Sequence, residues 1–506
     1  MLEAVPRSRW LRATVAAVAA ALIAAPAAHA ADQLSLIDTT EAVGPGISLH
    51  HQKFLDQSGW YDEQVLTVDL ANAAVKSDLL TAPHVAQGEA LTSMANRAGA
   101  AAGVNGDFFD IDSTQASLGG EIQAGSLIKS ADSGGWAHVG VGKDGIGRLV
   151  DLTLQATATL NGADRPILTV NAANGGGTPA NSVVAYTPAW GSQIRGRGMA
   201  GVANVAEVLV QDDKVVQVNP SAGSGAIPDG AYYLVGRDAG ADAIKALKPG
   251  DPVKLTYGLK DAAAQQMQWA IGTNKPLIKN GVAVPQGDTS VAPRTAIGFK
   301  DGGKTMFLLI TDGRQSQVVG TTLAQTAQML LDLGADTGLN LDGGGSTTLV
   351  ARPLGGDSAT LRNTPSDGHE RADPTGIGLF VVPGSGKPEE LVLPQDERVF
   401  PGLHRTLTAR AVDDHGTPVA AGDIAWTGAE NGVVRGPDAG DVSVRATATA
   451  GAAEGRATVH VLHPLRTLEL SSARLSYADA TPSLAQALEV TGRDDEGYPR
   501  RSSWRT

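Results

Sequence analysis

The fold is decided by residues 306–346, MFLLITDGRQSQVVGTTLAQTAQMLLDLGADTGLNLDGGGS. The run Met306–Ile310 is continuously apolar, which is typical of a buried strand. A helix is predicted to begin at Thr321 or Thr322, either of which can cap it, and to stop at Gly334. Its apolar face would consist of Leu323, Ala327, Leu330 and Leu331. Residues 339–342 alternate and predict a second strand, so the segment indicates a strand, helix, strand unit.

Polar residues end the second strand. Leu339 and Leu341 point one way, so Asn340 and Asp342 share the opposite face. The following Gly343, Gly344 and Gly345 let the backbone approach a ligand closely, and Ser346 adds a hydroxyl. A glycine-rich turn with a solvated Asp explains the same residues. Both interpretations stay open on these residues alone.

Two guanidinium groups lie near the neighbouring strand ends. Asp312 and Arg314 follow the first strand, and Arg294 and Thr295 open the strand before it. The planar fork of an arginine matches two phosphoryl oxygens. The structural alternatives are an Asp-Gly turn and a solvated arginine at a strand start.

A third polar stretch runs from Asn105 to Asp110 and includes Asp107 beside a phenylalanine pair. The phenylalanines fit a core equally well. Asp110 and Asp112 admit a Ca²⁺ site, although the twelve-residue calcium loop is not matched, and no other cofactor or metal site is predicted. Residues 196–201 match G-x-G-x-x-G, but a β-hairpin is expected at 208–218 where a dinucleotide site needs a helix.

Composition excludes several classes. The formal net charge of −13 and pI near 5.2 argue against nucleic acid as a partner. The chain has no cysteine, so disulfides, thiolate nucleophiles and Cys-ligated zinc are excluded. It also has no H-E-x-x-H motif, which disfavours a zinc hydrolase. Its 62 glycines and 4% aromatic residues favour short elements joined by tight turns, in a β-rich or mixed α+β domain.

The ends of the sequence predict an exported, modular chain. Residues 1–30 combine three arginines, an Ala-rich run and the tripeptide Ala28-His29-Ala30, which predicts a signal peptide and a secreted or cell-surface protein with no integral membrane span. We expect the catalytic domain over 31–383 and a Gly/Ser/Pro linker over 384–388. Alternating strands predict an all-β sandwich over 389–463.

The C-terminal part repeats itself. The stretch from Asp413 to Pro418 is echoed about 81 residues later from Asp494 to Pro499. This period suits an Ig-like module, and the segment resembles bacterial Ig-like domains. Residues 464–506 are therefore expected to be an incomplete second module. Such modules could also contact a cell-surface polymer.

Five motifs together resemble the phosphodiester glycosidase family, over roughly residues 49–382. They are Asn105-Gly106-Asp107-Phe108-Phe109, Pro293-Arg294-Thr295-Ala296-Ile297-Gly298, Asp312-Gly313-Arg314-Gln315, Leu341-Asp342-Gly343-Gly344-Gly345-Ser346 and the stretch from Asn363 to Arg371. The resemblance implies hydrolysis of a sugar 1-phosphodiester in an extracellular or cell-wall glycan. After Glu370-Arg371, the residues Ala372-Asp373-Pro374 depart from the small apolar residues usual in the family.

The expected catalytic residues are the carboxylates Asp342, Asp107, Asp312 and Glu370. Substrate binding is expected from Asn105, Arg294, Thr295, Arg314, Asn340, Gly343, Gly344, Gly345 and Ser346. The sequence does not divide the roles of acid, base and nucleophile among the carboxylates. Two alternatives are a protein that only binds a polysaccharide or teichoic polymer, and a glycosidase acting on an ordinary glycosidic bond.

Overall fold

The computed structural model describes residues 34–56, 59–133, 136–395, 397–436, 439–449, 453–470, 487–495 and 499–505. The expected signal peptide lies outside these residues. Strands dominate, and the described residues contain three short α-helices. The expectation of a mixed α+β domain therefore holds only coarsely, because the chain is mostly β.

The sheet that carries the deciding segment has eight antiparallel strands. In order they are β1 (Leu34–Gly44), β2 (Ile47–Asp56), β3 (Gly59–Asp69), β22 (Thr305–Thr311), β21 (Arg294–Lys300), β23 (Thr337–Asn340), β19 (Lys275–Lys279) and β20 (Val282–Ala283). Strands β22 and β23 do not pair with each other, because β21 lies between them.

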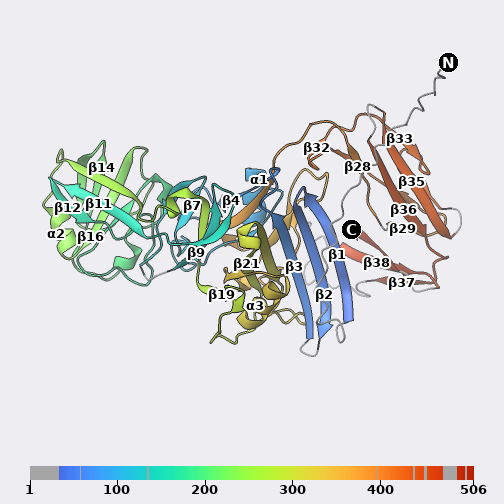
Figure 1. Ribbon diagram of the computed structural model, residues 1–506, viewed down its shortest axis with the longest axis horizontal. Helices are drawn as coiled ribbons and strands as arrows, with labels where there is room; N and C mark the ends of the chain where they lie inside the picture. Colours follow the sequence, from blue (N-terminus) through green and yellow to red (C-terminus); the bar gives the residue numbers. More distant parts are fainter. Residues whose placement is uncertain are drawn as a thin grey trace, which may run out of the picture. The chain divides into compact units, whose positions relative to one another are not determined.

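Strand β22 is continuously apolar from Met306 to Ile310 because both of its faces are covered. Phe307 and Leu309 pack under helix α3 (Leu323–Asp332), while Leu308 and Ile310 point into the main core. The helix begins at Thr322 with a capping box to Gln325, as the sequence predicted. Figure 1 shows α3 beside β19 and β21.

A second sheet closes the main core from the other side. It has five antiparallel strands: β25 (Thr360–Leu361), β24 (Leu349–Ala351), β6 (Ala102–Asn105), β27 (Thr375–Val381) and β4 (Val75–Thr81). Val104, Leu349 and Ile377 face the core, while Leu80 and Val350 pack under helix α1 (Leu91–Ala98). Two sheets with a helix outside each of them therefore bring the ends of β6, β21 and β23 together.

A third sheet of five strands joins the same core. Its strands are β10 (Gly147–Val150), β9 (Ala137–Gly142), β18 (Met267–Thr273), β7 (Glu121–Gln123) and β8 (Ser126–Lys129). The short strands β5 (Glu89–Ala90) and β26 (Ala372–Asp373) form a separate pair.

The segment between β10 and β18 forms a subdomain with its own core, which the sequence analysis did not separate from the rest of 31–383. Its elements are β11 (Leu154–Leu160), β12 (Ala163–Pro166), β13 (Val183–Tyr186), β14 (Val205–Gln211), β15 (Lys214–Asn219), β16 (Ala231–Arg237), α2 (Ala239–Lys245) and β17 (Val253–Leu259). Leu160, Val208, Leu234 and Ile244 are among its buried side chains. The predicted hairpin at 208–218 is confirmed as β14 and β15.

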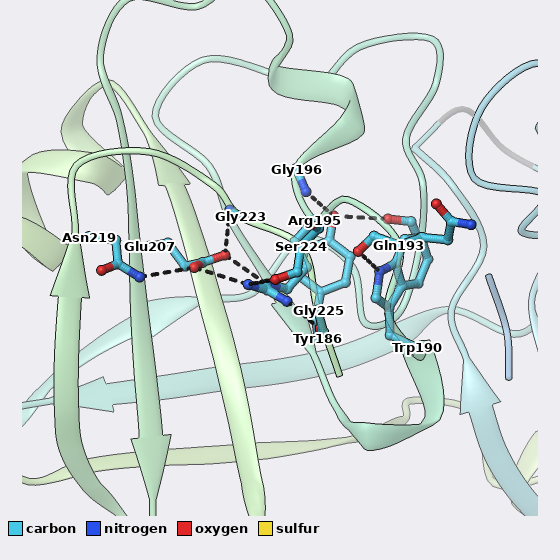
Figure 2. Close-up of polar contacts among 11 residues, drawn as sticks. Tyr186, Trp190, Gln193, Arg195, Gly196, Glu207, Asn219, Gly223, Ser224 and Gly225 are labelled. Carbon is cyan, nitrogen blue, oxygen red and sulfur yellow. Dashed lines mark hydrogen bonds and ion pairs between the residues drawn. The ribbon is translucent and has the colours of Figure 1, made fainter. Parts of the chain in front are cut away.

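A buried ion pair ties the loops of this subdomain together (Figure 2). Arg195 Nε donates to Glu207 at 2.7 Å, and its other nitrogens donate to the carbonyls of Ser224 and Gly225. The Cζ atom of Arg195 also lies 3.7 Å from the ring centroid of Tyr233. The loop that matched G-x-G-x-x-G follows Arg195 directly. The buried contacts of Arg195 therefore hold the start of this loop in place.

Residues after 388 form further sheets. One contains β28 (Glu390–Val392), β29 (Glu397–Val399), β31 (Arg410–Val412), β32 (Pro418–Val419), β33 (Ile424–Thr427), β35 (Gly440–Ala448) and β36 (Glu454–Val461). A second pairs β30 (His404–Thr406) with β34 (Val433–Arg435), and Val434 and Val459 share one core. β37 (Thr467–Leu470), β38 (Ala487–Arg493) and β39 (Pro499–Arg505) form a third. The Ig-like assignments of 389–463 and 464–506 remain predictions.

The predicted linker 384–388 is held by hydrogen bonds. The amides of Gly384 and Gly386 donate to Asp413 Oδ2, and the amide of Ser385 donates to Asp414. In the echoing repeat the amide of His463 donates to Asp494 Oδ2. In both copies, therefore, the Asp-Asp turn accepts hydrogen bonds from backbone amides that lie just before its own predicted module.

Candidate functional site

Asp342 follows β23 at the point where the two main sheets meet. Its amide donates to Gly106 O at 2.9 Å, and its carbonyl accepts from Asn105 Nδ2 at 2.8 Å. The Leu341 amide donates to Thr295 O, and the Thr295 hydroxyl donates to Asn105 Oδ1 at 2.7 Å. The buried Asn105 and Thr295 therefore fix the backbone of Asp342 and are supports of the site.

The Asp342 carboxylate is half-buried and receives two donors. Gly343 N donates to Oδ1 at 2.9 Å, and Ser346 Oγ donates to Oδ2 at 2.6 Å. Burial raises the pKa of Asp342 to about 6, although both hydrogen bonds and the charge of Arg371 act in the opposite direction. Asp342 is thus a carboxylate that changes protonation close to neutral pH.

At each position of the loop, a different steric contact explains why the residue is glycine. A Cβ on Gly343 would lie 2.7 Å from Pro293 O. Gly344 has a φ of 62°, and a Cβ there would touch the Arg314 guanidinium. A Cβ on Gly345 would overlap the ion pair between Arg371 and Asp367. The three glycines therefore let two guanidinium groups approach the loop that follows Asp342.

Arg314 and Arg294 differ in how they are held. The Arg314 side chain is exposed and has no hydrogen bond or ion pair among the described residues. Arg294 is tethered instead, because it donates to Thr321 O at 3.2 Å and to Ser290 O at 2.6 Å. Arg314 is consequently the guanidinium of this pair with all of its donors left for an anionic ligand.

Two residues of this cluster were not among the expected site residues. Arg371 Nη1 donates to Ser346 Oγ at 3.2 Å and pairs with Asp367. Asp373 is buried, and burial together with the charge of Asp342 raises its pKa well above the ordinary value. Arg371 belongs to a motif quoted above, and Asp373 was visible only as a departure from the family pattern.

The other expected carboxylates have structural partners. Asp312 is 3% exposed, and its two oxygens accept from Asn363 Nδ2 and the Thr364 amide, both at 2.8 Å. Glu370 accepts from the amide and the hydroxyl of Thr92 in the first turn of α1. Asp312 thus holds a loop and Glu370 caps a helix, and neither is hydrogen-bonded to Asp342.

Asp107 is enclosed and lies in a separate polar cluster. It is 1% exposed, and its oxygens accept from the amides of Phe108 at 2.7 Å and Gly119 at 2.6 Å. Burial raises the pKa of Asp107 to about 7, against the opposing charge of the buried Lys129. Asn340 is also buried, with Nδ2 bonded to Asn274 and Oδ1 without a partner.

Asp110, which the sequence admitted as a calcium ligand, is hydrogen-bonded and ion-paired within the protein. It accepts from the amide and the hydroxyl of Thr114, and it lies 3.5 Å from Arg197 Nε. Among the described residues there is no group of three His, Cys, Asp or Glu side chains that could hold a metal ion. In the same part of the chain, no helix is long and apolar enough to cross a membrane.

A family model matches the part of the chain that carries most of this cluster. Residues 204–380 match the model of the family described as phosphodiester glycosidase. The match contains Asp342, Arg314, Arg371 and Asp373, whereas the supports on β6 lie outside it. The family resemblance expected from the sequence is thereby confirmed, and no curated protein matches the sequence.

Solved structures show a similar fold. A hypothetical protein from Synechocystis is 22% identical with a TM-score of 0.56, over 68% of this chain and 64% of that one. The match thus spans less than two thirds of the Synechocystis protein. An exported-protein candidate of Burkholderia pseudomallei K96243 is 22% identical with a TM-score of 0.52, over 64% and 75% of the two chains.

A zebrafish structure was also matched, at a much lower TM-score. It is the N-acetylglucosamine-1-phosphodiester alpha-N-acetylglucosaminidase catalytic domain, auto-inhibited by its pro-peptide, with 18% identity and a TM-score of 0.35 over 69% of this chain and 88% of that one.

Proposed function

We propose that this chain hydrolyses the bond between the anomeric carbon of a sugar and a phosphodiester oxygen. The products are the free sugar and a phosphate monoester on the other alcohol. The observation that carries the proposal is one carboxylate, Asp342, on a rigid strand end whose glycine loop touches two guanidinium groups. Such chemistry needs a carboxylate near the anomeric carbon and cations near the phosphate.

The hydrogen bonds and ion pairs of the two arginines indicate a different role for each of them. Arg314 has donors to spare, so it is placed to bind the phosphodiester oxygens. Arg371 pairs with Asp367 and donates to Ser346, so it adds positive charge while holding the hydroxyl that orients Asp342. A substrate with an ordinary glycosidic bond would offer Arg314 no anionic group to bind. We therefore favour the phosphodiester as the substrate.

We also propose that this reaction takes place outside the cytoplasm. An exported chain would meet sugar 1-phosphodiesters in extracellular or cell-wall glycans, where residues 31–383 would act as the catalytic unit. The modules after the linker would then position this unit at a cell-surface polymer.

The test is a comparison of substrates by release of reducing sugar. We expect the purified chain to hydrolyse the methyl ester of a hexose 1-phosphate faster than the methyl glycoside of the same hexose. Asp342→Asn is the matched inactive control. Equal or faster cleavage of the glycoside would support an ordinary glycosidase, and tight binding of the diester without turnover would support a binding protein.

A further inference from the structure

Arg314 has a backbone conformation that residues other than glycine rarely adopt. Its φ is 56°, in the left-handed region, where a Cβ atom crowds the backbone. Its side chain is exposed and has no hydrogen bond or ion pair among the described residues. The side chain therefore does not hold this strained conformation, so the neighbouring residues must impose it.

Two side chains that flank Arg314 are bonded to one short segment of the chain. Asp312 Oδ1 accepts from Asn363 Nδ2, and Asp312 Oδ2 accepts from the Thr364 amide, both at 2.8 Å. On the other side, Gln315 Nε2 donates to the Thr364 carbonyl at 3.2 Å. Asp312 and Gln315 thus fasten both ends of the stretch that contains Arg314 to the same segment.

Close packing opposes a movement of the whole hairpin that carries Arg314. The Arg314 amide donates to Val319 O at 3.3 Å. A Cβ on Gly313 would lie 2.7 Å from the Gly320 Cα and 2.9 Å from the Pro293 nitrogen. A change of φ at Arg314 would therefore have to break a side-chain hydrogen bond to the fastening segment.

The same conformation places the guanidinium of Arg314 beside the glycine loop. A Cβ on Gly344 would lie 3.0 Å from Arg314 Nη1 and 3.3 Å from Nη2. The Gly344 amide donates to Pro293 O at 2.9 Å, and the glycine loop directly follows Asp342. An arginine that is already held at its binding position loses less conformational entropy when an anion binds.

We propose that Gln315 and Asp312 are positioning residues that hold Arg314 in the left-handed conformation and thereby set the affinity of the site for the phosphodiester. Neither residue contacts the substrate. Asp312, which the sequence predicted as a catalytic carboxylate, acts through Arg314. The kinetic part of this proposal rests on the proposed function, whereas the conformational part does not.

The kinetic part is tested by Gln315→Met, which removes the donor to Thr364 and keeps a side chain of similar length. We expect KM for the diester to rise about fivefold with kcat within about twofold of the wild type, because Arg314 is then held in place for less of the time. Gln317→Met is the matched control and should leave KM unchanged, because Gln317 is exposed in the same hairpin.

A second background shows whether Gln315 acts through Arg314. In a chain that carries Arg314→Ala, Gln315→Met should have no further effect on KM, because the guanidinium that it positions is absent. An unchanged KM in Gln315→Met alone would overturn the proposal. An equal rise of KM in both backgrounds would also overturn it.

Thermal melts measure the strain at position 314 without substrate. Glycine adopts a positive φ without the crowding of a Cβ atom, so Arg314→Gly should melt about 2 °C or more above Arg314→Ala. In chains that also carry Gln315→Met, position 314 can relax, and this difference should fall by half or more. Equal melting temperatures in the first pair, or an undiminished difference in the second, would overturn the proposal even if the diester is hydrolysed.

Discussion

Asp342→Asn is expected to abolish turnover and, at alkaline pH, to stabilise the fold. Burial raises the pKa of Asp342 from 3.8 to about 6. At about 1.36 kcal/mol for each tenfold change, ionised Asp342 disfavours the folded state by roughly 3 kcal/mol, as an upper bound. The asparagine loses part of this gain because Ser346 must rearrange, which costs on the order of 1 kcal/mol.

The sign of this effect depends on pH. A group with a raised folded-state pKa contributes stability below the pKa of the unfolded chain, and this contribution is lost as pH rises through the folded-state pKa. The melting temperature of Asp342→Asn should therefore exceed that of the wild type at pH 8 by a few degrees, and the difference should vanish near pH 4.

Parallel thermal melts and kinetics at pH 8 and pH 4 test this reasoning. We expect kcat to fall on the order of a hundredfold or more. A variant that is less stable than the wild type at pH 8 would mean that the Asp342 carboxylate serves the fold. Full activity would remove Asp342 from the catalytic machinery.

The other predictions concern the cations, a buried ion pair and the glycine loop. Arg314→Lys should raise KM for the diester because an ammonium lacks the planar fork, whereas Arg294→Lys should change KM less because this side chain is tethered; equal effects would contradict the distinction. Glu207→Gln should lower the free energy of unfolding by about 3–5 kcal/mol in urea melts. Glu454→Gln, at a partly exposed ion pair, should lower it by less than about 1 kcal/mol. Gly345→Ala should cost about 1–3 kcal/mol of stability and lower kcat, because the ion pair packed on Gly345 must move; a variant with wild-type melting and kinetics would show that the loop tolerates a Cβ.

Short-range patterns predicted the local structure well. The capping residue Thr322, the stop at Gly334 and the apolar run of β22 depend on neighbours within a few positions. Asp342 at a strand end before a glycine loop could be predicted for the same reason. The subdomain between β10 and β18 was missed, because no Gly/Ser/Pro break marks its edges.

The roles of the carboxylates could not be predicted, because their donors come from distant parts of the chain. Glu370 is bonded to Thr92, which precedes it by 278 positions, and Asp312 to Asn363, which follows it by 51. Motif spacing shows that a carboxylate is near the glycine loop, but it does not show whether a hydrogen-bond donor already occupies it. Asp373 was missed because its burial near the charge of Asp342 depends on the tertiary fold.

The Asp-Asp turn gives the predicted linker the properties of a joint. A free Gly-Ser segment would let a module swing on the nanosecond scale and would offer its peptide bonds to proteases. With the amides of Gly384, Ser385 and Gly386 bonded to Asp413 and Asp414, these bonds are held against an unfolded conformation that a protease requires. The echoing stretch keeps one such contact, because the amide of His463 donates to Asp494 Oδ2. An array of modules built on the predicted repeat would therefore carry a hydrogen-bonded contact at each junction.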